Sequence, residues 1–88
     1  MKSSPEILNI GFNNIVFKKR IISIVGADAA PVKRLREHAR EENKLIDATN
    51  GKKTKSVIIA DSMHVILCAL SPETLSLRVE GNSESKKK

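Results

Sequence analysis

A cluster of lysines beside an Asn-Gly pair is the part of this sequence best suited to chemistry. The segment Asn50-Gly51-Lys52-Lys53-Thr54-Lys55 carries three lysines, and no acidic residue lies between Asp47 and Asp61 to neutralise them. Asn and Gly both tolerate positive φ, so Asn-Gly between two apolar runs predicts a tight hairpin turn. Lysines on a protruding turn attract anions, and the net charge of +6 favours the phosphates of a nucleic-acid backbone.

Two further basic clusters accompany this turn. Lys18-Lys19-Arg20 precedes an apolar run with no acid among its members, and we expect it to contact phosphate as well. Charged turns that keep sheet edges soluble are the alternative for both clusters. The third cluster lies on a predicted helix, where Lys33, Arg36 and Arg40 share one face. Because Glu37 and Glu41 interleave with them, this face either is solvated and partly self-paired, or contacts DNA or a neighbouring subunit.

The residue pattern gives little evidence for a catalytic site or a metal site. His38 and His64 have no partner at metal-ligand spacing, and no glycine-rich phosphate-binding loop occurs. Asp47 and Asp61 meet only if their strands pair, and capping of turns is their expected role. We therefore expect a protein that is not an enzyme, with no catalytic residues, metal, cofactor or small-molecule substrate.

Composition narrows the choice of partner. The chain has 88 residues, with 16 Lys and Arg against 10 Asp and Glu, and its only aromatic residues are Phe12 and Phe17. Proteins that bind single strands stack bases on aromatic side chains, so double-stranded DNA suits this chain better. A core this small is thin, which favours self-association.

The remaining composition concerns location and domain organisation. A lone Cys68 in an apolar run predicts a small buried hydrophobe, and we expect neither a signal peptide nor a membrane-spanning helix from the apolar runs. We expect a soluble cytoplasmic protein without a membrane partner. A single domain is predicted over residues 1–80, followed by a disordered basic tail over residues 81–88.

The pattern of apolar residues predicts a small α+β fold with a mostly antiparallel sheet. One main helix is expected over about residues 31–43, with Asp28 near its start and the apolar stripe Val32, Leu35 and Ala39 facing the sheet. A short helix is expected over about residues 72–79, capped by Ser71. Residues 21–25 predict a well-buried strand, and residues 45–48, 57–60 and 65–70 predict three strands in an antiparallel meander.

Several short blocks of the sequence, in the same order and spacing, resemble the RemA family of bacterial extracellular-matrix regulators. The resemblance runs from about residue 9 to residue 77. It is carried by Asn9-Ile10-Gly11-Phe12-Asn13-Asn14-Ile15-Val16, Arg20-Ile21-Ile22-Ser23-Ile24-Val25, Ala30-Pro31-Val32-Lys33-Arg34, Leu45-Ile46-Asp47-Ala48-Thr49 with Gly51, Asp61-Ser62-Met63-His64-Val65-Ile66-Leu67 and Pro72-Glu73-Thr74.

The resemblance implies a cytoplasmic DNA-binding protein that activates biofilm-matrix and osmoprotection genes. It also implies a homo-oligomeric ring, with octamers expected, whose rim presents basic residues to DNA. The family's contacts include an arginine at the position of Arg20 and an arginine pair at the positions of Lys52 and Lys53. Lysine binds phosphate as a point charge and lacks the planar fork that reads guanine, so sequence preference should either be weaker here or rest on DNA bending and spacing across the ring.

Together these observations predict that Arg20, Lys52 and Lys53 gather on one solvent-facing rim that assembly repeats. Two other classes of function remain open. One is a scaffold that binds acidic proteins, and the other is an RNA-binding module.

Overall fold

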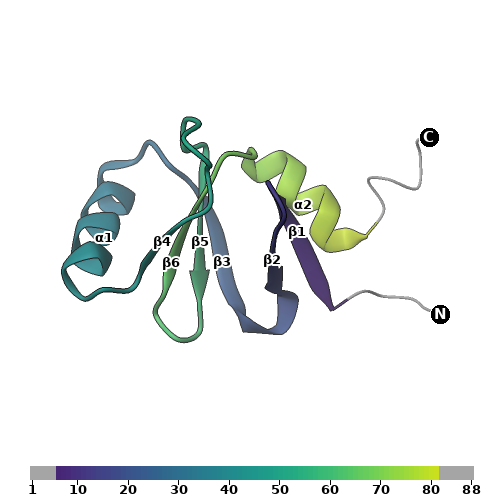
Figure 1. Ribbon diagram of the computed structural model, residues 1–88, viewed down its shortest axis with the longest axis horizontal. Coiled ribbons are helices and arrows are strands. Elements are labelled where there is room, and N and C mark those ends of the chain that lie inside the picture. Colours follow the sequence, from purple (N-terminus) through teal and green to yellow (C-terminus); the bar gives the residue numbers. More distant parts are fainter. Residues whose placement is uncertain (1–5, 82–88) are drawn as a thin grey trace.

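The computed structural model describes residues 6–81 and has the expected α+β composition (Figure 1). Its elements, in chain order, are β1 (Ile7–Gly11), β2 (Asn14–Phe17), the 3₁₀ turn η1 (Lys18–Arg20), β3 (Ile21–Gly26), α1 (Ala30–Glu41), β4 (Leu45–Asp47), β5 (Ser56–Ala60), β6 (Val65–Cys68) and α2 (Pro72–Glu80). The predicted tail lies outside the described residues, apart from Gly81.

The strands form a β1–β2 hairpin and a four-stranded sheet of order β3-β5-β6-β4. Within residues 6–81, three strand pairs are antiparallel and one is parallel. The predicted meander is wrong in one respect, because β4 pairs in parallel with β6 and does not touch β5 in the ladder. The tight turn after Ala60 brings β6 beside β5, and β3 takes the other side of β5, so the three-residue β4 is left at the edge.

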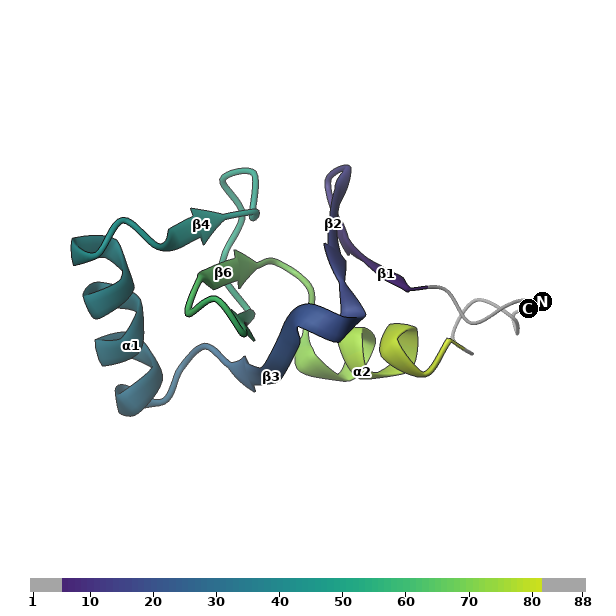
Figure 2. The same cartoon turned by 90° about the horizontal axis from the view of Figure 1, so that it is seen from below.

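Two hydrophobic cores lie on opposite faces of this sheet, because successive strand residues point to opposite sides. On one face Val57, Val65 and Leu67 pack with the α1 stripe of Val32, Leu35 and Ala39, as the sequence predicts. On the other face Ile58, Ile66 and Cys68 pack with Leu8, Ile10 and Leu75. Figures 1 and 2 show the result, with α1 on one side of the sheet and α2 with the β1–β2 hairpin on the other.

Strand β3 differs from the prediction of a well-buried strand. It forms an edge of the sheet, none of its residues is fully buried, and the side chain of Ile22 is 63% exposed. A run of β-branched residues predicts a strand but does not say whether a neighbour covers it within the same chain. The apolar side chain of Ile22 is therefore exposed to solvent in a single chain.

Both helices lie within two residues of their predicted ends. Helix α1 begins at Ala30 without a side-chain cap, so Asp28 does not cap it, and Asn43 adopts φ of 61° just beyond its end. Helix α2 begins as expected, since the Oγ of Ser71 accepts a hydrogen bond from the backbone N–H of Thr74 at 3.1 Å. Cys68 is buried, as predicted.

Candidate nucleic-acid interface

The lysine-rich segment, residues 49–55, forms a loop that projects from one end of the sheet (Figure 1) and is called the lysine loop below. Asn50 and Gly51 have φ of 54° and 82°, and the N–H of Lys52 donates to the carbonyl of Thr49 at 2.9 Å. These are the features of the tight turn that Asn-Gly predicts. The turn exists, although the strands on either side of it do not form a hairpin.

Hydrogen bonds anchor both ends of the lysine loop. The carboxylate of Asp47 accepts from the N–H of Thr49 at 2.9 Å and from its hydroxyl at 2.6 Å, and Thr49 is only 3% exposed. At the other end the N–H of Lys55 donates to the carbonyl of Cys68 at 2.9 Å. Lys52, Lys53 and Lys55 remain exposed between these anchors, and none of them forms an ion pair within residues 6–81.

The hydrogen bonds from Thr49 lower the pKa of the Asp47 carboxyl, and the charge of Arg36 adds to this effect. Asp47 therefore caps a turn, as expected, and holds its negative charge where the loop begins. A carboxylate that accepts two hydrogen bonds is stabilised in its ionised form.

We expect Asp47→Ala to loosen the lysine loop. Without the hydrogen bonds to Asp47, the backbone amide of Thr49 should exchange its hydrogen about five- to tenfold faster. This factor corresponds to the net free energy of one hydrogen bond. Folding lowers the pKa of Asp47. The stabilisation that its hydrogen bonds to Thr49 provide should therefore be present at pH values above the unfolded pKa of about 3.9, and it should be lost as the pH falls through the folded pKa. Exchange measured by NMR at several pH values tests both statements. Asp28→Ala is the matched control, and equal acceleration in both variants would contradict the anchoring role.

Arg20 lies at the opposite end of the sheet from the lysine loop. The β3–β5 register places Ile21 against Ala60 and Gly26 against Ser56, so Arg20 and the loop flank the two ends of β5. The four residue steps between Ser56 and Ala60 alone span about 13 Å. The structure therefore does not gather Arg20, Lys52 and Lys53 into one patch within a single chain.

The other residues of the first basic cluster differ in their surroundings. The Nζ of Lys18 donates to the carbonyl of Val79 at 2.8 Å, in the last turn of α2, where a cation complements the helix dipole. Lys19 is exposed, and the Nε of Arg20 donates to both carboxylate oxygens of Asp61 at 2.8 and 2.9 Å. Asp47 and Asp61 lie at opposite ends of the sheet and do not meet.

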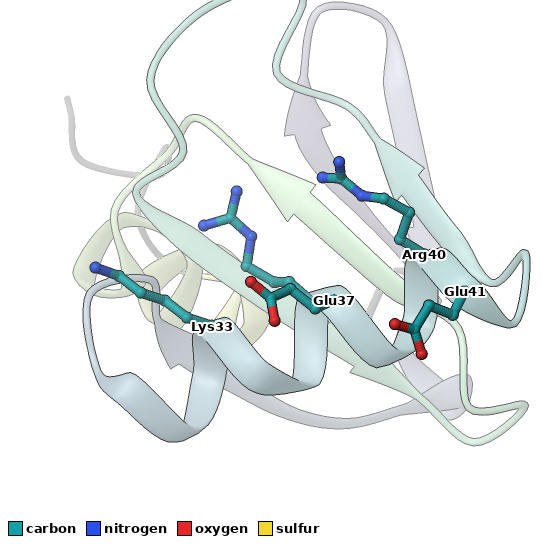
Figure 3. Close-up of a pocket in the computed structure, with 5 residues that line it drawn as sticks. Lys33, Glu37, Arg40 and Glu41 are labelled. Carbon is teal, nitrogen blue, oxygen red and sulfur yellow. The ribbon is translucent and has the colours of Figure 1, made fainter.

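The charged face of α1 forms a shallow hollow of about 410 Å³ (Figure 3). Figure 3 shows Lys33, Glu37, Arg40 and Glu41 projecting from one side of the helix, with cations and carboxylates alternating. Arg36 also lines the hollow and is the member close enough to influence Asp47. The mixture of signs gives no concentrated positive charge, but no ion pair joins these side chains within residues 6–81, so the face is solvated and not self-paired.

The sequence pattern did not reveal two exposed apolar surfaces, one along the edge strand β3 and one between β2 and the sheet as far as the edge strand β4, with Ile21 lining both. The first, called the β3–α2 surface, is a hollow of about 510 Å³ whose apolar lining includes Ile22 and Val79. The second, called the β2–β4 surface, lines a hollow of about 280 Å³ and includes the exposed side chains of Ile15, Phe17 and Ile46, and Arg20 and Asp61 line the same hollow. Exposed apolar side chains that gather in one place are typical of surfaces that contact another molecule.

Residues 7–79 match the RemA-like family, described as extracellular matrix regulatory protein A-like. The chain belongs to this family. The match covers β1 through nearly all of α2, and thus includes the lysine loop, Arg20 and both apolar surfaces.

Several bacterial proteins resemble this RemA-like chain along most of their length. A protein of Oceanobacillus iheyensis named "Putative regulatory protein OB1501" is 54% identical over 79 residues, covering 90% of this chain and 92% of its own. A protein of Fervidobacterium nodosum named "Putative regulatory protein" is 54% identical over 72 residues, covering 82% and 77%. A similarly named protein of Leptospira biflexa is 53% identical over 78 residues, covering 89% and 83%. Neither helix between residues 6 and 81 has the length and apolar character needed to cross a bilayer.

Proposed function

We propose that this RemA-like chain is a transcriptional regulator that binds double-stranded DNA and activates genes of the extracellular matrix. The observation that carries the proposal is the lysine loop, which is exposed, anchored at both ends and free of acidic partners within residues 6–81. An anchored loop places its charges without the entropy cost of ordering a flexible segment on binding.

The contact is to phosphates more than to bases. Lysine is a point charge with no planar fork, so Lys52 and Lys53 attract the backbone without reading guanine bidentately. Each neutralised phosphate contributes about −0.9 to the slope of log affinity against log salt. Three contacts from one subunit thus give a slope of about −3, which is weak binding for a single copy.

Assembly supplies the missing affinity in this proposal. The β3–α2 surface includes the edge strand β3, the β2–β4 surface reaches the edge strand β4, and their lining residues differ, so they suit head-to-tail contact between copies. Arg20 and Asp61 also line the β2–β4 hollow, so this contact must leave the terminal N–H groups of Arg20 open to DNA. Head-to-tail contacts close into a ring when the rotation between subunits permits it, and eight subunits is the size we expect. A ring repeats the lysine loop and Arg20 around its circumference, and several weak contacts then act on one duplex.

The ring also offers an arrangement in which Arg20 and the lysine loop serve the same DNA. Within one chain they lie at opposite ends of β5 and contact different phosphates. Around a ring, the Arg20 end of one subunit and the lysine loop of another repeat along the same duplex. The proposed contact is therefore distributed over subunits, and no single subunit holds a complete site.

A titration of fluorescent duplex DNA with the purified protein tests this function. We expect affinity for a random 30-base-pair duplex to fall between about 50 and 200 mM salt, with a slope of about −3 or steeper. Duplex RNA and an acidic protein of equal charge are measured in parallel. Salt-independent or undetectable DNA binding would refute the proposal, and preference for RNA or for the acidic protein would replace it with one of those functions.

A further inference from the structure

Arg20 is held in place by a carboxylate on another element. Its Nε donates to the Oδ1 and Oδ2 atoms of Asp61 at 2.8 and 2.9 Å. Guanidinium carries five N–H donors, and this pairing uses only the one on Nε. The remaining donors, on the two Nη atoms, make no hydrogen bond within residues 6–81. These terminal groups form the edge that binds a phosphate bidentately.

The backbone fixes both members of the pair. The N–H of Asp61 donates to the carbonyl of Arg20 at 2.7 Å, which extends the β3–β5 ladder one step beyond Ile21 and Ala60. The turn that carries Asp61 is itself braced, because the Nζ of Lys44 donates to the carbonyl of Ser62 at 3.2 Å. The backbone that carries both side chains is therefore held in place, and the carboxylate is brought within reach of the guanidinium.

Stability does not account for this pair. The side chains of Arg20 and Asp61 are 61% and 47% exposed, and exposed ion pairs contribute about 0–1 kcal/mol to folding. An arginine side chain, in contrast, has about 2 kcal/mol of rotamer entropy to lose when it is ordered. A partner that orders the side chain beforehand reduces what DNA binding must supply.

We propose that Asp61 is a positioning residue, which orients Arg20 so that its terminal N–H groups face a DNA phosphate. This inference rests on the proposed function, since it assigns a role within the same DNA contact. It places a negative charge beside the DNA as part of the binding site. Charge alone gives the opposite expectation, because removing a carboxylate raises the net positive charge and strengthens attraction to DNA.

Positioning of Arg20 and net charge predict opposite changes in DNA affinity for Asp61→Ala, so this variant distinguishes them. We expect its duplex affinity to fall about three- to tenfold relative to wild type, although its net charge rises by one. The matched control is Asp28→Ala, which removes the same charge from an exposed residue that does not cap α1. We expect the control to bind as well as wild type or better. Light scattering and thermal melting first establish that both variants assemble and fold as wild type does.

A double-mutant cycle separates positioning from structural damage. In an Arg20→Ala background, Asp61→Ala should cause no further loss of affinity, because no guanidinium remains to be oriented. An equal loss in that background would overturn the inference and point to a structural role. A gain in affinity for Asp61→Ala alone would also overturn it, while the proposed function would stand. Absence of DNA binding by the wild-type protein is a different result, and it would refute the function itself.

Discussion

Replacing both Lys52 and Lys53 by alanine is expected to abolish detectable duplex binding. At about 0.1 M salt each phosphate contact contributes close to a factor of eight relative to 1 M, so two contacts contribute about 60-fold per engaged subunit. With several subunits on one duplex the loss multiplies. The slope of log affinity against log salt should also become shallower by about 2 for every engaged subunit. Fluorescence anisotropy over a range of salt measures both quantities.

Two controls separate a local contact from a general effect of charge. Lys33→Ala with Arg34→Ala removes the same charge from α1, whose face at Lys33 carries interleaved acids, and should weaken binding far less. Lys52→Arg with Lys53→Arg keeps the charge and should retain binding. If the α1 variant loses as much affinity as the loop variant, the lysine loop has no special role.

Replacing Ile22 by glutamate is expected to dissociate the oligomer. Ile22 is 63% exposed on an edge strand and lines the β3–α2 surface, so burial against a neighbouring copy would leave the new carboxylate desolvated and unpaired. Folding of the single chain should change little, because no residue of the same chain covers this side chain fully. Duplex affinity should fall by about 10²- to 10⁴-fold through loss of avidity.

Met63→Glu is the matched control for this prediction. Met63 is also 63% exposed, but it lies in the turn between β5 and β6 and lines neither apolar surface. Sedimentation velocity should give one small species for Ile22→Glu and the wild-type assembly for Met63→Glu. An assembled Ile22→Glu variant would exclude the β3–α2 surface as a subunit contact.

The helices, the turn chemistry and most strands could be predicted from the sequence because their signals are local. Ser71 caps α2 through a bond to a residue three positions away, and Asn50-Gly51 adopts its turn whatever the flanking strands do. The partner of β4 could not be predicted in the same way. The position of β4 at the sheet edge depends on which longer strands cover both sides of β5, and that is decided by packing across the whole chain.

The features of the candidate site also differ in whether their sequence signals are local. The exposed lysines of the loop were predicted from the absence of nearby acids in the sequence. The contacts of Arg20 and Lys18 were not, because they join residues 41 and 61 positions apart. The exposure of Ile22, Phe17 and Ile46 could not be predicted either. An apolar residue in a strand gives the same sequence pattern whether the residues that cover it belong to its own chain or to another.

Lysine footprinting in the presence of DNA tests the central claim most directly. Acetylation of each lysine is measured by mass spectrometry with and without a saturating duplex at low salt. We expect Lys52 and Lys53 to become strongly protected, while Lys33 on α1 is labelled equally in both states. Unchanged labelling of Lys52 and Lys53 on fully bound protein would contradict the account, because DNA would then lie elsewhere on the molecule.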